Sequence, residues 1–299
     1  MIFLLRRGLT SLVQLLVVSV LVFFFFRLLP GDIFSAELEN PQRSRASVEA
    51  LREARGLNQS WPRQYLSWLE SSARGDFGIS LAYGIPVSTL IGSRMRNTLE
   101  VALPALAVTW LIGLGGALLL GRTRIVPLVV GPGAAAAAMI PDVAAVSLLL
   151  WLAVWMGLSI TGPWLPIAGL TFAMAPVVFL HASTELRHAR DLDFVRIAES
   201  RGLPVDRLWL RYILPAAANP LVSLAGLSIA GAIGSSFVVE VLTGWPGLGP
   251  LFLDAVQARD YPIVQTVLIL LAAVLVFSNL TADLILYRLD PRIRLPHER

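Results

Sequence analysis

Six stretches of this sequence are long and apolar enough to cross a lipid bilayer as helices, and this feature limits the fold most strongly. A spanning helix needs about 20 mostly apolar residues, because the hydrocarbon core is about 30 Å thick. Only 15% of the residues are charged, whereas a soluble domain is about 25% charged. We therefore predict an all-α membrane protein with six transmembrane helices, at residues 9–29, 98–120, 126–155, 165–181, 221–242 and 263–286.

The first and third stretches differ from ordinary spans. The first follows closely on two arginines, as in a secretory signal peptide, but its apolar region is too long and no small-residue cleavage site follows. We expect it to be retained as an anchor. The third contains Pro127, Pro132 and Pro141, and we interpret it as one span whose backbone hydrogen bonding opens at a proline.

The placement of arginine orients the chain, because short cytoplasmic loops of membrane proteins are rich in basic residues. With a cytoplasmic N-terminus, only Arg259 falls in the short outer loops, 156–164 and 243–262. Fourteen arginines then lie inside: Arg6, Arg7, Arg122, Arg124, Arg187, Arg190, Arg196, Arg201, Arg207, Arg211, Arg288, Arg292, Arg294 and Arg299. We predict that both termini are cytoplasmic, and that these arginines set topology and do not bind nucleic acid.

The spans divide the chain into four parts. These are an N-terminal helix at 1–30, an outer segment at 31–96, a five-helix core at 97–290 and a cytoplasmic tail at 291–299. In the outer segment, 47–56 and 61–73 have the apolar spacing of amphipathic helices. The aromatic residues of the second, Trp61, Tyr65 and Trp68, suit the membrane interface, the surface of the bundle itself or a partner protein.

Missing residue types exclude several activities. There is no lysine, which the phosphate-binding loop of ATPases requires, and there is no cysteine for disulfides, thiolate metal sites or nucleophilic catalysis. The three histidines, His181, His188 and His297, are too scattered for a His-rich metal site. We predict a chain that is not an enzyme and has no catalytic site, metal site or cofactor of its own.

The most informative segment is the polar stretch at 186–219, between the fourth and fifth spans. Asp191 or Asp193 can cap a helix that Gly202 ends, and Pro204 suits the first turn of a second helix. The pattern predicts a helix, a sharp turn and a helix along the cytoplasmic face. Such an element is either a docking site for a soluble partner or an ordinary amphipathic connector.

This segment resembles the EAA loop of ABC importer permeases, whose pattern is Glu-Ala-Ala-x3-Gly-x9-Ile-x-Leu-Pro. Gly202, Leu214 and Pro215 keep the spacing and Ala198 matches the second alanine, whereas Arg196, Ile197 and Tyr212 depart from the pattern. The run Asp193-Phe194-Val195-Arg196-Ile197-Ala198, followed by Gly202-Leu203, is similar to the form found in the peptide and nickel branch of the family.

Further motifs in the same order extend the resemblance over nearly the whole chain. They include Gly75-Asp76-Phe77-Gly78, Asn97-Thr98-Leu99-Glu100, Trp245-Pro246-Gly247-Leu248-Gly249, Ala258-Arg259-Asp260-Tyr261-Pro262 and Leu289-Asp290-Pro291-Arg292. With these motifs, the chain resembles the first permease subunit of the dipeptide, oligopeptide and nickel importers.

This resemblance implies the type I importer fold in a bacterial inner membrane, with a homologous second permease, two ATPase subunits that bind ATP and Mg²⁺, and an extracytoplasmic substrate-binding protein. It implies dipeptides or oligopeptides as cargo, with nickel or a metal–chelator complex as the alternative. The residues that it assigns to ATPase coupling are Asp193, Phe194, Arg196, Ile197, Ala198, Glu199, Gly202, Leu203, Leu214 and Pro215, with Phe194, Ile197 and Leu203 as the apolar contacts.

Ionisable residues inside spans are the other candidates, because a charge costs about 3 kcal/mol or more at the bilayer centre. Asp142, beside Pro141, and Glu240 are candidates for the translocation path, although structural roles are favoured for Glu240 and Glu100. Asp283 is expected to form a packing or capping pair with its neighbour Asn279. Proton-coupled transport through Asp142 and Glu240 is a competing hypothesis. A receptor or anchoring protein whose outer segment binds a ligand without transport is another.

Overall fold

The computed structural model describes residues 2–28, 59–122 and 126–289, and these residues are helical apart from their connections. No strand occurs among them, and Ile79 and Pro86 form an isolated β-bridge. The helices are α1 (Ile2–Leu28), α4 (Trp61–Ala73), α5 (Val87–Leu120), α6 (Val126–Ala138), α7 (Asp142–Trp155), α8 (Trp164–Arg190), α9 (Asp193–Ser200), α10 (Val205–Leu208), the π-helical turn η1 (Trp209–Ile213), α11 (Leu214–Ala216), α12 (Ala218–Thr243), α13 (Leu248–Gln257) and α14 (Tyr261–Leu289).

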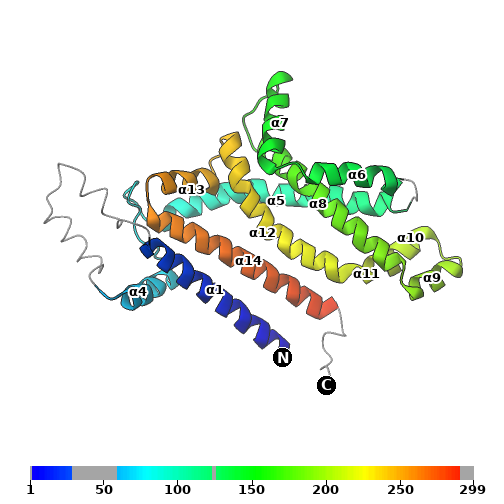
Figure 1. Cartoon of the computed structure of the whole chain (residues 1–299), viewed down its shortest axis with the longest axis horizontal. Coiled ribbons are helices and arrows are strands. Elements are labelled where there is room, and N and C mark those ends of the chain that lie inside the picture. Colours follow the sequence, from blue (N-terminus) through cyan, green and yellow to red (C-terminus); the bar gives the residue numbers. More distant parts are fainter. Residues whose placement is uncertain (1, 29–58, 123–125, 290–299) are drawn as a thin grey trace.

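Within this described part, five helices are long and apolar enough to cross a membrane: α1, α5, α8, α12 and α14. Figure 1 shows α1 lying along α14, and α12 between α14 and α8. The described part of the chain is therefore all-helical and of the multi-pass membrane type.

The predicted third span is not one continuous helix. It is divided into α6 and α7, which meet at an angle of 102° across a break of three residues, Met139 to Pro141. Pro141 precedes the first residue of α7, where its fixed φ angle is compatible with the start of a helix. As a result α7 projects from the other helices, at the top of Figure 1.

The structure has helical residues beyond the predicted spans at several places, and two of them lie close to the site described below. The helix predicted at 98–120 begins at Val87, because a polar extension that includes Arg94 continues it outside the apolar stretch. The predicted loop 243–262 contains a further helix, α13.

Close packing between spans depends on small residues. A Cβ atom at Gly226 of α12 would lie 2.8 Å from the Cβ atom of Ala282 in α14, and one at Gly113 of α5 would lie 2.7 Å from a methyl carbon of Val178 in α8. Small residues of this kind let helix backbones approach closely in membranes. They fix the core against which the loops are positioned.

The predicted amphipathic helix at 61–73 is confirmed as α4, whereas the one predicted at 47–56 lies outside the described residues. The aromatic face of α4 packs on α1: Tyr65 and Trp68 lie 5.4 Å and 5.8 Å from Phe23 between ring centroids. The Tyr65 hydroxyl also hydrogen-bonds Ser19 at 2.8 Å. Of the three surfaces predicted to contact the aromatic face of α4, the structure shows the helix bundle.

Candidate functional site

The short helix α9 has one buried and one exposed apolar face. Val195 is fully buried and Ala198 is 5% exposed, and both belong to a core cluster shared with α5, α8 and α12. On the other face, Phe194 and Ile197 are 51% and 54% exposed. An amphipathic helix normally exposes its polar face, so two large exposed apolar side chains on α9 indicate a contact surface.

The start of α9 differs from the prediction. Leu192 is the N-cap residue and Asp193 is the first helical residue, and no side chain caps the helix. The prediction that Asp191 or Asp193 caps it is wrong, because the Asp191 carboxylate instead accepts a hydrogen bond from Arg196 at 3.3 Å. Asp193 still lies in the first turn, where a negative charge is favourable.

The predicted turn at Gly202 is confirmed. Its φ angle is +73°, in the left-handed region that favours glycine, and its N–H donates to the Glu199 carbonyl at 3.0 Å. Pro204 is the N-cap residue of α10, which continues through η1 into α11. The predicted helix–turn–helix segment (residues 193–215) is therefore present, with a π-helical turn that the pattern did not predict.

Buried apolar side chains attach the helix–turn–helix segment to the spans. The Trp209 side chain is 3% exposed and Ile213 is fully buried. A Cβ atom at Gly121, at the end of α5, would lie 2.6 Å from the Trp209 indole ring, so this glycine allows α5 to approach the segment closely. Leu203 packs against the same cluster, and it therefore contributes less to the exposed surface than Phe194 and Ile197.

Ion pairs hold the rim of the segment. They join Arg190 to Glu199 at 3.1 Å, Arg196 to Asp191 at 3.3 Å and Arg122 to Asp206 at 2.6 Å. Pairs between exposed groups contribute about 0–1 kcal/mol each. They orient the segment, while the buried residues supply most of its stability.

An apolar groove of about 710 Å³ lies beside the segment, between α5, α9, α11 and α12. It brings together three of the predicted coupling residues, Phe194, Leu214 and Pro215, with Trp110 and Leu114 of α5. Phe194 therefore belongs both to the exposed face of α9, with Ile197, and to the groove, with Leu214 and Pro215.

Asp142 does not lie in the middle of a straight span. It is the first residue of α7, directly after the break, and its side chain is half-buried next to the exposed Pro141. The opening of the span expected beside Pro141 is present, and the chain turns there and starts a new helix at Asp142.

Glu240 belongs to a buried corner formed by Thr98, Glu240, Leu248 and Gly249, with the exposed Pro246 at its edge. Glu240 is fully buried, and its Oε2 atom accepts the Gly249 N–H at 2.7 Å. The Leu248 N–H donates to the Thr98 hydroxyl at 2.9 Å, and the Asn97 amide donates to the Pro246 carbonyl at 2.7 Å. These bonds join α5, α12 and α13.

A second buried acid holds the outer segment to the core. Asp260 is fully buried, and its Oδ2 atom accepts the Ser80 hydroxyl at 2.5 Å and the Ala82 N–H at 3.0 Å. Glu100, by contrast, pairs with Arg96 at the helix surface, and Asp283 forms an ion pair with Arg7.

Sequence reasoning missed one polar face of α8. His181 and His188 are exposed and Glu185 is half-buried between them, at spacings of four and three residues, which place them on one side of a helix. That spacing is the signal from which the face could have been found. No group of three His, Cys, Asp or Glu side chains in the part of the chain that the structure describes is arranged to hold a metal.

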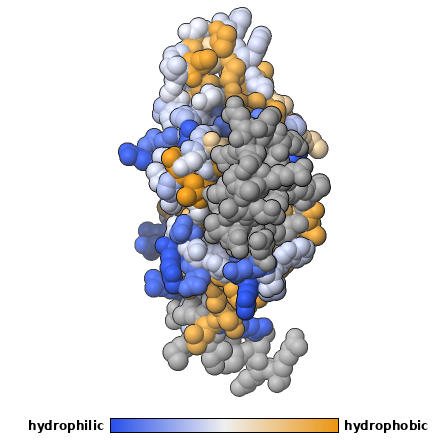
Figure 2. All heavy atoms as spheres, turned by 90° about the vertical axis from the view of Figure 1, so that its left-hand side faces the viewer, coloured by the Kyte–Doolittle hydropathy of each residue, from blue (hydrophilic) through white to orange (hydrophobic). Residues whose placement is uncertain are grey.

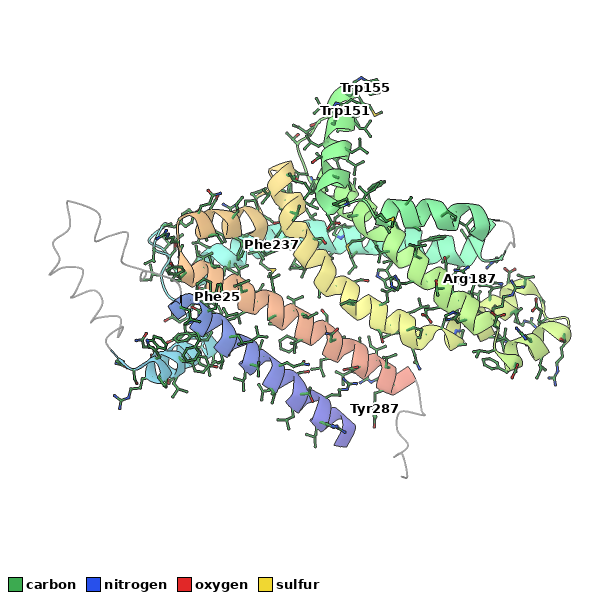
Figure 3. The ribbon with its side chains drawn as sticks, viewed as in Figure 1. Phe25, Trp151, Trp155, Arg187, Phe237 and Tyr287 are labelled. Atoms are coloured by element: carbon green, nitrogen blue, oxygen red, sulfur yellow. The ribbon has the colours of Figure 1, made fainter. Side chains whose placement is uncertain are left out.

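The faces that other chains or lipid would cover are apolar. Figure 3 shows Trp151 and Trp155 at the free end of α7, where they stack with ring centroids 6.4 Å apart, and both are exposed. Figure 2, which views the left-hand side of Figure 1, shows apolar residues on the projecting part at the top.

The sequence matches two protein-family models that together cover most of its length. Residues 112–295 match the family "Binding-protein-dependent transport system inner membrane component", and residues 1–102 match the N-terminal region of such membrane components. A probable peptide ABC transporter permease, y4tP of Sinorhizobium fredii, is 29% identical over 98% of this chain and 99% of its own length. The oligopeptide transport system permease AppB of Bacillus subtilis is 30% identical over 97% and 98%.

One solved structure shares the fold. A chain of the MetNI methionine ABC transporter, in an inward-facing conformation, superposes with a TM-score of 0.60 and 20% sequence identity. The match covers 67% of this chain and 96% of the other.

Proposed function

The chain belongs to the family of binding-protein-dependent transport system inner membrane components, and from that premise we propose that it imports peptides as the first permease subunit of an ATP-driven ABC importer. The names of its relatives y4tP and AppB, a peptide and an oligopeptide permease, support peptides as cargo. Nickel or a metal–chelator complex remains the alternative cargo. Uptake of a labelled tripeptide and of labelled nickel, compared in cells with and without the gene, separates the two.

ATP hydrolysis belongs, in this proposal, to two partner ATPases that bind ATP and Mg²⁺, and the helix–turn–helix segment is where one of them docks. The observation that carries the proposal is the division of α9 into two apolar faces, with Val195 and Ala198 buried and Phe194 and Ile197 exposed. Because Trp209 ties the segment to α5, a force on the exposed face moves the spans and not the loop alone.

This docking assignment is tested by replacing Phe194 and Ile197 together with serine. Loss of central apolar contacts costs more than about 1 kcal/mol each, so we expect co-purification of the ATPases to fall about tenfold or more, with a matching loss of uptake. Folding should be preserved, because both side chains are exposed. Leu66→Ser, at an equally exposed site on α4, is the control and should change neither measurement. Full ATPase retention in the double variant would contradict docking at α9.

The partners proposed for the remaining surfaces are a homologous second permease and an extracytoplasmic binding protein. The exposed apolar residues of α7 suit contact with the second permease or with lipid. Asp142, with Pro141 at the break of the span, is proposed to face the translocation path. For Glu240 we propose a structural role, because its buried carboxylate already binds the Gly249 N–H.

In the proposed topology both termini lie in the bacterial cytoplasm, and α4 lies outside. The chain has no cysteine, so a single introduced cysteine reports its own position. Ser67→Cys, on the exposed side of α4, should react with a membrane-impermeant thiol reagent in intact cells, whereas Ser200→Cys, exposed at the end of α9, should react only after the cells are opened. The reverse pattern would invert the topology.

A further inference from the structure

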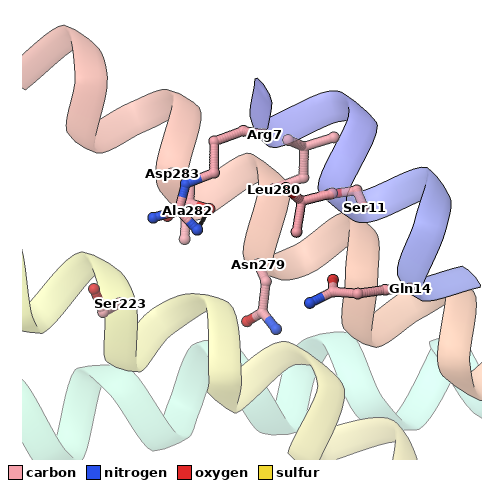
Figure 4. Close-up of a pocket in the computed structure, with 9 residues that line it drawn as sticks. Arg7, Ser11, Gln14, Ser223, Asn279, Leu280, Ala282 and Asp283 are labelled. Carbon is pink, nitrogen blue, oxygen red and sulfur yellow. Dashed lines mark ion pairs between the residues drawn. The ribbon is translucent and has the colours of Figure 1, made fainter. Parts of the chain in front are cut away.

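Polar side chains gather in a small cavity between α1, α12 and α14, where apolar packing is expected. The cavity has a volume of about 220 Å³, and its lining includes Arg7, Ser11, Gln14, Ser223, Asn279 and Asp283. Figure 4 shows Gln14 from α1 and Asn279 from α14 directed toward the same space. None of these residues belongs to the helix–turn–helix segment or to the buried corner.

The cavity lies near one end of the helices, at the level expected for lipid headgroups. Arg7 is in the second turn of α1, and Asp283 is six residues before the end of α14, which places both about 9 Å inside the helix ends. The side of α1 that faces away from the bundle is apolar, with Leu5, Leu9 and Leu12 more than half exposed. A polar cavity therefore opens beside a surface that lipid covers.

Two opposite charges define the chemistry of the cavity. The Arg7 guanidinium and the Asp283 carboxylate form an ion pair at 3.1 Å and are 49% and 26% exposed. A guanidinium has five donors and a carboxylate about four acceptor sites, so the two groups can pair with each other and bind a ligand that carries both charges. Gln14 and Asn279 add neutral donors and acceptors.

We propose that this cavity binds the headgroup of a zwitterionic aminophospholipid from the leaflet at which α1 begins. Its phosphate is placed on Arg7, where a guanidinium forms charge-assisted hydrogen bonds, and its primary ammonium on Asp283. The cavity is lined by α1, α12 and α14, so the bound lipid would join α1 to the core. The N-terminal family model matches α1, and the model of the membrane component matches α12 and α14.

The same features exclude other ligands. Cavities that enclose whole small molecules measure about 300–1,000 Å³, so this one is too small for a peptide cargo. A purely anionic headgroup would have to share the Arg7 guanidinium with Asp283 and would bring no ammonium group to the carboxylate. A choline headgroup has no N–H to donate to the carboxylate.

The proposal is tested on the full chain with its co-purifying subunits, delipidated and then supplied with equal amounts of phosphatidylethanolamine, phosphatidylcholine and phosphatidylglycerol. Native mass spectrometry should detect about one retained phosphatidylethanolamine per chain. Arg7→Gln and Asp283→Asn should each lower that retention about tenfold, the change that corresponds to loss of one charged hydrogen bond. Arg6→Gln, which removes the same charge one residue away, is the matched control and should retain the lipid.

A second variant separates lipid binding from helix packing. Ser11→Leu fills the cavity while it leaves the Arg7–Asp283 pair in place, so it should lose the lipid without loss of thermal stability in detergent. Equal retention of all three lipids by the wild type would overturn the proposal, as would retention of phosphatidylethanolamine by Ser11→Leu. Retention of phosphatidylglycerol that depends on Arg7 but not on Asp283 would replace it with an anionic-lipid site.

Discussion

The buried corner and the helix–turn–helix segment both join spans through a short loop, but they are built in opposite ways. In the corner, buried polar groups bond from one helix to another: the Glu240 Oε2 atom accepts the Gly249 N–H and the Thr98 hydroxyl accepts the Leu248 N–H. In the segment, charges are paired at the surface, and the apolar residues Phe194 and Ile197 are exposed.

This difference indicates that the corner stabilises the fold, whereas the segment serves the interaction with partners. A buried polar group that loses its partner costs about 1–3 kcal/mol, so the corner tolerates little change and holds α5, α12 and α13 in one arrangement. Exposed ion pairs contribute little to stability, so the segment tolerates change in the isolated chain. Variants of the corner should therefore unfold the protein, and variants of the segment should disconnect it from partners.

The largest effect is expected for Gly249→Ala in the corner. A Cβ atom there would lie 2.7 Å from the Cα atom of Phe237, and backbone cannot move aside as a flexible side chain can. Overpacking costs about 1–3 kcal/mol and sometimes more, and we expect a loss of about 3 kcal/mol. Thermal unfolding of the purified chain in detergent measures it.

Gly92→Ala is the control for this variant. Gly92 lies on an exposed side of α5 near the same end, with nothing within 4 Å of a Cβ atom, and alanine favours a helix by about 0.5–1 kcal/mol. It should leave stability unchanged or raise it. Equal stability of both variants would show that the corner is not tightly packed.

A smaller effect on stability is expected for Gly202→Val in the helix–turn–helix segment. Valine at a φ angle of +73° is strained by about 1–2 kcal/mol, but nothing crowds the site. The chain should stay folded while ATPase co-purification and uptake fall, because the two helices of the segment change their relative orientation.

Gly157→Val is the matched control, since Gly157 also has a positive φ angle, +66°, and open space around it, at the end of α7. It should cost similar stability and leave ATPase co-purification intact. If both variants lost the ATPases equally, general destabilisation and not docking geometry would explain the effect.

Much of the helical fold was predictable from hydropathy, because a span must be apolar over its whole length. Where spans bend was only partly predictable from proline. The third span opens beside Pro141, as expected for one of its prolines, whereas Pro104, Pro132 and Pro176 lie inside continuous helices. The outer extension of α5 was missed because it mixes apolar and polar residues and is not a continuous apolar stretch; its apolar residues Val87 and Ile91 pack in a cluster with α13.

The sequence predicted the turn of the helix–turn–helix segment, but not which of its side chains are buried and which are exposed. A glycine followed by a proline marks a helix end and a new start, and Gly202 and Pro204 behave in this way. Which apolar residues point outward depends on the spans behind the segment. Leu203 therefore proved to be packed on the core, and no local pattern distinguished it from Phe194. Trp209 could likewise not be recognised as the buried anchor, because its contact with Gly121 joins distant parts of the sequence.

The smallest effect on stability is expected for Asp142→Asn. This variant tests whether the break between α6 and α7 has a structural role, like the corner, or a role in interaction, like the segment. Asp142 is half-buried in the first turn of α7, where a carboxylate contributes about 0.3–1 kcal/mol through the helix dipole. Asparagine keeps the size of the side chain and removes its charge, so thermal stability and ATPase co-purification should be preserved. If the carboxylate faces the translocation path, uptake of a lysine-rich peptide should fall several-fold while uptake of a neutral peptide is maintained. An equal loss for both peptides would assign Asp142 to structure, as for Glu240 in the corner, and no loss for either would place it away from the cargo.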